Sequence, residues 1–159
     1  MSHSLRPFEG VKSVLVVLSS RAMTFDQAAL RNHIHHAYPG AAVFFVSVSG
    51  DPVGMKAPSR VDLVVDFSEP GARQSLWFAH RMRSQGRHVV GRKTGLFYRQ
   101  ARYDRVYDGR ADTLAPGDFI ESERHAQKKV LELAGIPVSR QGGLTRDLGK
   151  EIGASLPAR

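Results

Sequence analysis

The sequence predicts an α/β domain built on a mainly parallel sheet, and three observations support this class. Apolar segments rich in β-branched residues alternate along the chain with segments of helical periodicity. The first apolar segment is continuous rather than alternating, as in a strand that is covered on both faces. With 159 residues, of which 42% are hydrophobic, the chain has room for one domain with a substantial core. We therefore expect a three-layer, Rossmann-like domain with a sheet of about five strands.

The first strand and the first helix have the clearest sequence signals. SVLVVLS, residues 13–19, is the expected central strand because its apolar run is unbroken. Thr24 and Gln27 match a T-x-x-Q capping box, which predicts that a helix begins there. Pro39 and Gly40 end that helix.

Two further strands and a second helix follow. AVFFVSV, residues 42–48, and VDLVVDF, residues 61–67, are the predicted strands. The glycines and prolines of residues 50–59 leave little room for a helix between them. Ser68 is the expected cap of a helix that Gly86 ends.

The last third of the chain contains shorter strands and one helix. We predict strands at residues 87–91 and 104–108, and residues 92–102 fit either a helix or a loop. Asp118 with Glu121 forms a second capping box, and the helix that follows ends at Gly135, ahead of Pro137. On this basis residues 1–138 form the domain, and residues 139–159 form a polar, glycine-rich tail or linker.

The carboxyl ends of the strands are where open parallel sheets bind ligands, so the polar residues there are the candidate site. Asp66, at the end of the third predicted strand, is the candidate catalytic residue, because a general base at that position faces the crevice. The candidate ligand-binding residues are hydroxyls and cations that follow the first and fourth strands: Ser19, Ser20, Arg21, Arg92, Lys93, Arg99 and Arg102.

Several classes of site are not expected. The turn SSRAMT contains no glycine, so it matches neither a dinucleotide fingerprint nor a P-loop, and we predict no cofactor. The chain has no cysteine, and of its three neighbouring histidines only His33 and His36 share a helix face, so we predict no metal. The absence of cysteine and of an apolar leader favours a cytoplasmic protein without a transmembrane segment.

Positive charge is concentrated in one segment. The chain carries a net charge of +8, and residues 80–110 hold nine basic and two acidic residues, a net +7. Arginines alternate there with aromatic residues, namely Phe97, Tyr98, Tyr103 and Tyr107. Such a segment suits a phosphorylated glycan or another polyanion, and it equally suits nucleic acid.

The order of these segments resembles the N-terminal half of family 9 glycosyltransferases, the lipopolysaccharide heptosyltransferases. The resemblance covers residues 11–138 and is carried by the order of SVLVVLSS, ALRNHIHHAYPGAAVFFVSV, VDLVVDFSEPGARQSLWFAHRM, GRKTGLFYRQARYDRVYD and ESERHAQKKVLELAGIPV. It implies a domain that holds a phosphorylated acceptor and lacks the donor-binding domain. The family's catalytic Asp follows the first strand, where this chain has Arg21, Ala22 and Met23, and Asp26 lies too far into the helix to match. The resemblance therefore implies that the chain does not transfer sugar by itself and works, if at all, with a donor-binding partner.

Two other resemblances leave alternatives open. Asp66 with Thr94 resembles the phospho-acceptor and threonine positions of a response-regulator receiver, but Ala115 stands where the receiver lysine belongs. A degenerate receiver would serve as a protein-interaction module, and it requires a helix within residues 50–59. DFSEPGA and HVVGRKTG resemble segments of dihydrodipicolinate reductase, whose nucleotide fingerprint is missing here.

Overall fold

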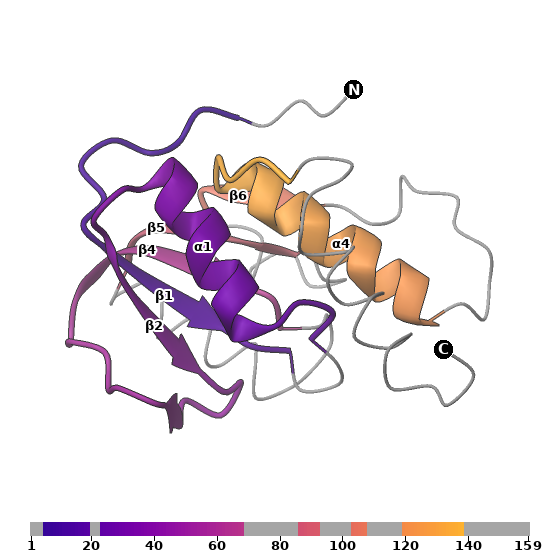
Figure 1. Ribbon diagram of the computed structural model, residues 1–159, viewed down its shortest axis with the longest axis horizontal. Coiled ribbons are helices and arrows are strands. Elements are labelled where there is room, and N and C mark those ends of the chain that lie inside the picture. Colours follow the sequence, from indigo (N-terminus) through magenta and orange to yellow (C-terminus); the bar gives the residue numbers. More distant parts are fainter. Residues whose placement is uncertain (1–4, 20–22, 69–85, 93–102, 108–118, 139–159) are drawn as a thin grey trace.

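Six strands and two helices make up the described part of the chain (Figure 1). The computed structural model describes residues 5–19, 23–68, 86–92, 103–107 and 119–138. The strands are β1 (Ser13–Val17), β2 (Ala42–Val46), β3 (Pro52–Val53), β4 (Val61–Asp66), β5 (Gly86–Arg92) and β6 (Arg105–Tyr107), and the helices are α1 (Gln27–Ala37) and α4 (Phe119–Leu133).

The strands form one sheet in the order β3-β2-β1-β4-β5-β6. Every neighbouring pair is parallel except β2 with β3. The predicted α/β class with a mainly parallel sheet is thus confirmed, with β1 at the centre. The first three predicted strands end slightly earlier than expected, and the fourth, β5, is slightly longer.

The connection between β2 and β4 contains a strand that the sequence did not indicate. Pro52 and Val53 pair antiparallel with the end of β2, and the Ser47 amide donates to the Asp51 carbonyl at 2.9 Å. Gly50 turns the chain with a φ of 97°. The connection holds no helix, as predicted, but it adds an edge strand to the sheet.

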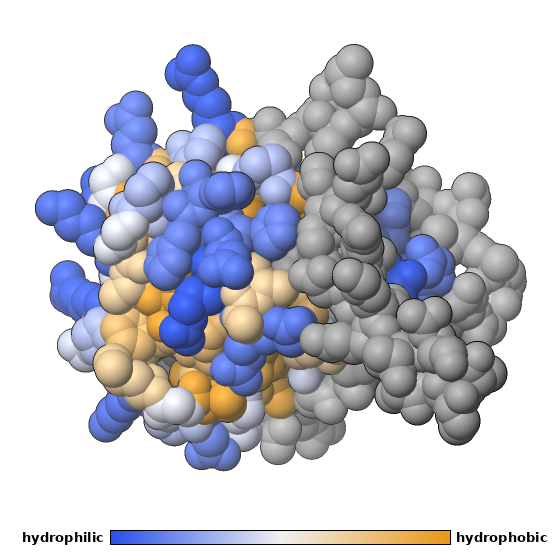
Figure 2. All heavy atoms as spheres, viewed as in Figure 1, coloured by the Kyte–Doolittle hydropathy of each residue, from blue (hydrophilic) through white to orange (hydrophobic). Residues whose placement is uncertain are grey.

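Apolar side chains lie on both faces of the sheet. On one face, Val16 and Leu63 pack with Leu30 of α1 and Leu131 of α4, so both described helices cover this face. On the other face, Leu15, Val17, Val64 and Val89 form a second cluster with the ring of Tyr103. The outward side of α1 is hydrophilic, as Figure 2 shows, and its exposed residues include Arg31, Asn32 and His36.

The predicted capping box of α1 is wrong, because the N-cap is Asp26. The Asp26 carboxylate accepts a hydrogen bond from the Ala29 amide at 2.7 Å, which satisfies one of the free donors of the first turn. Thr24 lies two residues earlier, and its amide and hydroxyl donate to Gln127 instead. Thr24 therefore bonds to a residue that is distant in the sequence instead of capping α1, and a local sequence pattern does not reveal such a partner.

The end of α4 follows the predicted pattern. Gly135 adopts a φ of 79° and donates to the Glu132 carbonyl at 3.0 Å, and Ile136 donates to the Leu131 carbonyl at 2.9 Å. These two bonds are those of a Schellman motif, which confirms Gly135 as the residue that terminates the helix after Leu133. The predicted cap Asp118, the predicted helix of residues 68–85 beyond Ser68, the stretch 93–102 and the tail 139–159 lie outside the described residues.

Arg105, a member of the basic segment, has a structural role at this end of α4. Its guanidinium donates to the Leu133 carbonyl at 2.7 Å and to the Arg6 carbonyl at 2.9 Å. It also lies over the Phe8 ring, 3.9 Å from the centroid. A cation beside the last carbonyls of a helix complements the helix dipole, so Arg105 fastens the N-terminal segment to α4.

Tyr38, beside the same junction, gives the fold a dependence on alkaline pH. Its hydroxyl donates to the Ala134 carbonyl at 2.5 Å and accepts from the Phe8 amide at 3.0 Å. Burial raises the pKa of Tyr38, and this effect outweighs the Phe8 hydrogen bond and the Arg105 charge, which lower it. Because the folded state holds the phenol proton more tightly than the unfolded chain does, this stabilisation is present below pH 10.0 and is lost as pH rises through the higher folded pKa.

We expect Tyr38→Phe to flatten the alkaline loss of stability. At about pH 8 the variant is less stable by about 1 kcal/mol, because the hydrogen bond to Ala134 is lost. Urea unfolding at intervals up to about pH 11 should show a smaller decline for Tyr38→Phe than for the unmodified chain. Parallel declines in the two proteins would contradict this assignment.

Candidate functional site

The direction of strand addition reverses between β1 and β4. The chain passes from β1 to β2 on one side and returns to β4 on the other, and Val17 of β1 is in register with Asp66 of β4. The Phe67 amide donates to the Val17 carbonyl at 2.9 Å, so the two strands stay paired to their ends. Ser19 and Ser68 follow these ends. Open parallel sheets bind ligands at such a switch point.

Asp66 is buried at the switch point, with 1% of its surface exposed. One carboxylate oxygen accepts from the Ser68 amide at 2.8 Å, and the other accepts from the Tyr103 hydroxyl. Gly91 of β5 makes room for the tyrosine, because a Cβ on this residue would lie 2.2 Å from Cε1 of the Tyr103 ring. Two donors therefore fix the orientation of the predicted catalytic carboxylate, and its catalytic role stays a prediction.

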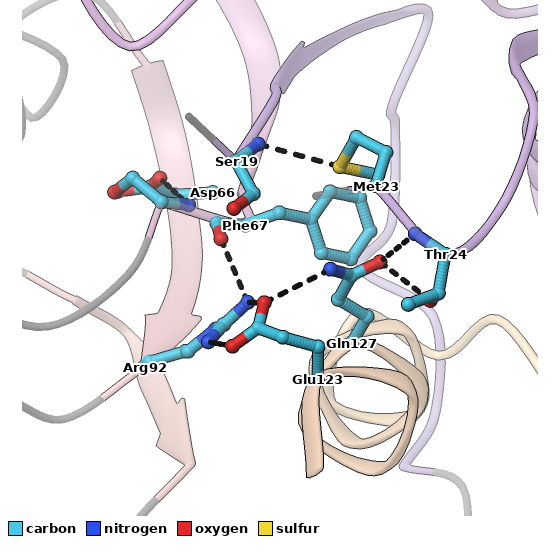
Figure 3. Close-up of polar contacts among 9 residues, drawn as sticks. Ser19, Met23, Thr24, Asp66, Phe67, Arg92, Glu123 and Gln127 are labelled. Carbon is cyan, nitrogen blue, oxygen red and sulfur yellow. Dashed lines mark hydrogen bonds and ion pairs between the residues drawn. The ribbon is translucent and has the colours of Figure 1, made fainter. Parts of the chain in front are cut away.

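Arg92, at the end of β5, is also buried, with 4% of its surface exposed. Its two terminal nitrogens each donate to a different Glu123 oxygen at 2.8 Å (Figure 3). Nη2 donates as well to the Phe67 carbonyl at 2.9 Å. The guanidinium predicted to meet a ligand is thus engaged by a carboxylate of α4 in the fork geometry that arginine prefers.

The polar contacts continue from Glu123 to the turn after β1. Gln127 donates to Glu123 at 3.2 Å, and its amide oxygen accepts from the Thr24 amide at 3.0 Å and the Thr24 hydroxyl at 2.8 Å. The Ser19 amide donates to the Met23 sulfur at 3.3 Å (Figure 3). Through these side chains α4 links the turn after β1 to the ends of β4 and β5. We name Thr24, Gln127, Glu123 and Arg92 the α4 network.

Asp66 and Arg92 lie on opposite faces of the sheet. Side chains alternate along a strand, so Asp66 shares a face with Val64, and Arg92 shares a face with Val90. Figure 3 shows Asp66 directed away from the Arg92 and Glu123 pair. The structure therefore places both predicted residues at the carboxyl ends of neighbouring strands, but their side chains do not contact a common site. Ser19 is half-buried near them, and Ser20, Arg21, Lys93, Arg99 and Arg102 lie outside the described residues.

The sequence did not predict the contacts that Glu123, Gln127, Tyr103 and Gly91 make at the site. One signal was present for the first two, because Glu123, Gln127 and Val130 follow the i, i+4, i+7 spacing of a single helix face. Polar residues at positions where the pattern expects core residues indicate a buried network. Gly91 and Tyr103 carried no such signal, because their contact depends on the packing of β5 against the segment before β6.

The structure gives no support to a metal site within the described ranges. No group of three or more His, Cys, Asp or Glu residues there is close enough to hold a metal ion. His35, which lies between His33 and His36 in the sequence, hydrogen-bonds to the Ala41 carbonyl at 2.8 Å. Among the same residues, no helix has the length and hydropathy that a bilayer crossing requires.

The fold and the site define an α/β protein with a mainly parallel sheet and a buried polar cluster at the switch point of that sheet. With β3 counted, the strand order is that of a dinucleotide-binding sheet with one strand reversed; without β3, the parallel strands follow the 2-1-3-4-5 order of flavodoxin-like proteins. No protein-family model matches the chain, and no curated protein matches its sequence significantly.

Proposed function

We propose that this chain is a binding domain whose sheet edge, at the carboxyl ends of β1, β4 and β5, holds a phosphorylated glycan or another polyanion. The observation that carries the proposal is the switch point itself, where the ends of β1 and β4 meet beside Arg92. The chain runs from Arg92 directly into Lys93, and it reaches Arg21 two residues after Ser19. In the sequence, a predicted phosphate-binding cation therefore follows the end of β1 and another follows the end of β5.

The resemblance to the acceptor half of family 9 heptosyltransferases supplies the ligand class in this proposal. Acceptors of that family are phosphorylated, and arginine binds phosphate through paired hydrogen bonds. We propose further that the domain is cytoplasmic, is incomplete as an enzyme, and works with a partner if a donor sugar is involved. The position of Arg21, where the family has its catalytic Asp, and the burial of Asp66 beside Tyr103 favour binding over catalysis.

A three-layer arrangement is part of the same proposal. The face that carries Leu15, Val17, Val64 and Val89 is apolar and needs a cover. A right-handed connection from β4 to β5 would pass over that face, opposite α1. The helical pattern of residues 69–85 suits this layer.

The receiver-like alternative has one observation in its favour and two against it. The order of the parallel strands is that of a receiver, with Asp66 ending the third of them. However, residues 50–59 contain β3 and no helix, and Asp66 is too buried to accept a phosphoryl group without rearrangement. These observations count heavily against a receiver module.

Binding measurements at several salt concentrations test the proposed function. We expect calorimetry to detect binding of phosphorylated lipopolysaccharide core oligosaccharide, with an affinity that falls as salt rises, and weaker binding of the dephosphorylated oligosaccharide. Arg99→Gln with Arg102→Gln should reduce the affinity about tenfold or more. A matched control, Lys56→Gln with Arg60→Gln, removes the same charge from exposed positions ahead of β4 and should change it little.

Two outcomes would overturn the proposal. One is the absence of binding to any polyanion at low salt. The other is tighter binding to single- or double-stranded DNA than to the phosphorylated oligosaccharide, which would favour the nucleic-acid alternative.

A further inference from the structure

The Arg92 guanidinium keeps unused donor capacity although it is buried. Arginine has five N–H groups, and the acceptors that Arg92 meets among the described residues are the Glu123 carboxylate and the Phe67 carbonyl. Within the described part of the chain, the buried Nε of Arg92 has no acceptor. A buried donor without a partner is costly and is a place where a bound ion or water is expected.

The Glu123 carboxylate binds the Arg92 guanidinium in the way that a phosphate group would. A carboxylate and a phosphate both accept two parallel hydrogen bonds from a guanidinium, with the spacing that Glu123 shows here. The two residues are 31 positions apart and belong to different elements, β5 and α4. Their contact therefore depends on how α4 docks against the sheet edge.

We infer that Glu123 is an internal competitor at an anion site, and that the phosphate group of an acidic ligand binds Arg92 by replacing the Glu123 carboxylate. This inference rests on the proposed function and assigns a regulating residue to the same site. Once displaced, Glu123 keeps an acceptor role toward Gln127, whose side chain also holds Thr24. Replacement of the Glu123 carboxylate by phosphate at Arg92 would thus alter the contacts of Gln127 with Thr24, ahead of α1.

The test compares Glu123→Gln with Glu121→Gln, using inorganic phosphate as the probe. Both variants remove one negative charge from α4, but Glu121 lies on the surface in an exposed pair with Arg124. If Glu123 leaves Arg92 in only about 1–10% of the unmodified molecules, its removal raises the apparent phosphate affinity about 10- to 100-fold. Glu121→Gln should bind phosphate as the unmodified chain does. Calorimetry or phosphorus NMR titration gives the affinities, and urea unfolding checks that each variant is folded.

Two further variants keep the inference open to refutation. Glu123→Asp retains the charge but draws the carboxylate back from Arg92. It serves as the test if Glu123→Gln fails to fold, and we expect its apparent phosphate affinity to rise about 2- to 10-fold. In Arg92→Gln with Glu123→Gln the gain should disappear, because the guanidinium is absent. Equal affinities in Glu123→Gln, Glu121→Gln and the unmodified chain would overturn the inference, and so would a gain that persists without Arg92. If the unmodified chain still binds phosphorylated oligosaccharide in either case, the proposed function stands and only the competitor role fails.

Discussion

Arg92→Met is expected to lower the free energy of unfolding by about 3–5 kcal/mol. The side chain is similar in length, so the main loss is the charge that accompanies the Glu123 carboxylate inside the protein. Both partners are almost fully buried, with side-chain exposures of 5% and 9%. Urea unfolding followed by circular dichroism measures the effect.

Two comparisons separate this cost from a general effect of losing arginine. Arg124→Met breaks a pair of equal length, 2.8 Å, whose side chains are 20% and 53% exposed, and it should cost less than about 1 kcal/mol. Arg92→Met with Glu123→Leu removes both charges and should recover most of the lost stability. Similar costs for Arg92→Met and Arg124→Met would show that the buried pair has no special weight.

The strands were predictable because their signal is local. An unbroken apolar run such as residues 13–19 needs cover on both faces, and the structure places β1 at the centre with apolar clusters on each side. The end of α4 was predictable for the same reason, because Gly135 supplies a backbone conformation that other residues rarely adopt.

The site was less predictable because its contacts join distant residues. Thr24 and Gln127 are 103 positions apart, and their hydrogen bonds replaced the cap that the local pattern indicated. The sequence predicts Arg92 as a ligand-binding cation after the fourth strand, yet the alternation of side chains along β5 turns it toward α4 and Glu123. The positions of Asp66 and Arg92 at the ends of their strands followed from the sequence, whereas the direction and the partner of each of these side chains followed from packing.

The α4 network contributes both to the stability of the fold and to the proposed binding site. The contacts that hold α4 on the sheet use the same guanidinium that we propose for the ligand. A ligand that takes Arg92 from Glu123 must therefore supply the interaction that α4 loses. This requirement would favour a doubly charged phosphate group over a weaker anion.

Gly91→Ala is expected to destabilise the protein by about 3 kcal/mol. The added methyl would lie 2.2 Å from Cε1 and 2.8 Å from Cζ of Tyr103, so the ring must move. Gly91 lies within β5, and its φ is not in the left-handed region, so the cost arises from overpacking rather than from backbone strain. Movement of the ring would also take the Tyr103 hydroxyl away from Asp66.

A double-mutant cycle shows whether the clash with Tyr103 is the cause. Tyr103→Leu removes the ring atoms, so adding Gly91→Ala to it should cost at least about 1 kcal/mol less than in the unmodified chain. Tyr103→Phe keeps the ring and removes only the donor to Asp66, which measures the hydrogen bond apart from the packing. If Gly91→Ala costs the same with and without the Tyr103 ring, the clash with Tyr103 is not the cause of the destabilisation. If the cost falls as expected, Gly91 is the residue that lets Tyr103 reach the switch point, and any ligand that contacts Asp66 does so with this tyrosine beside it.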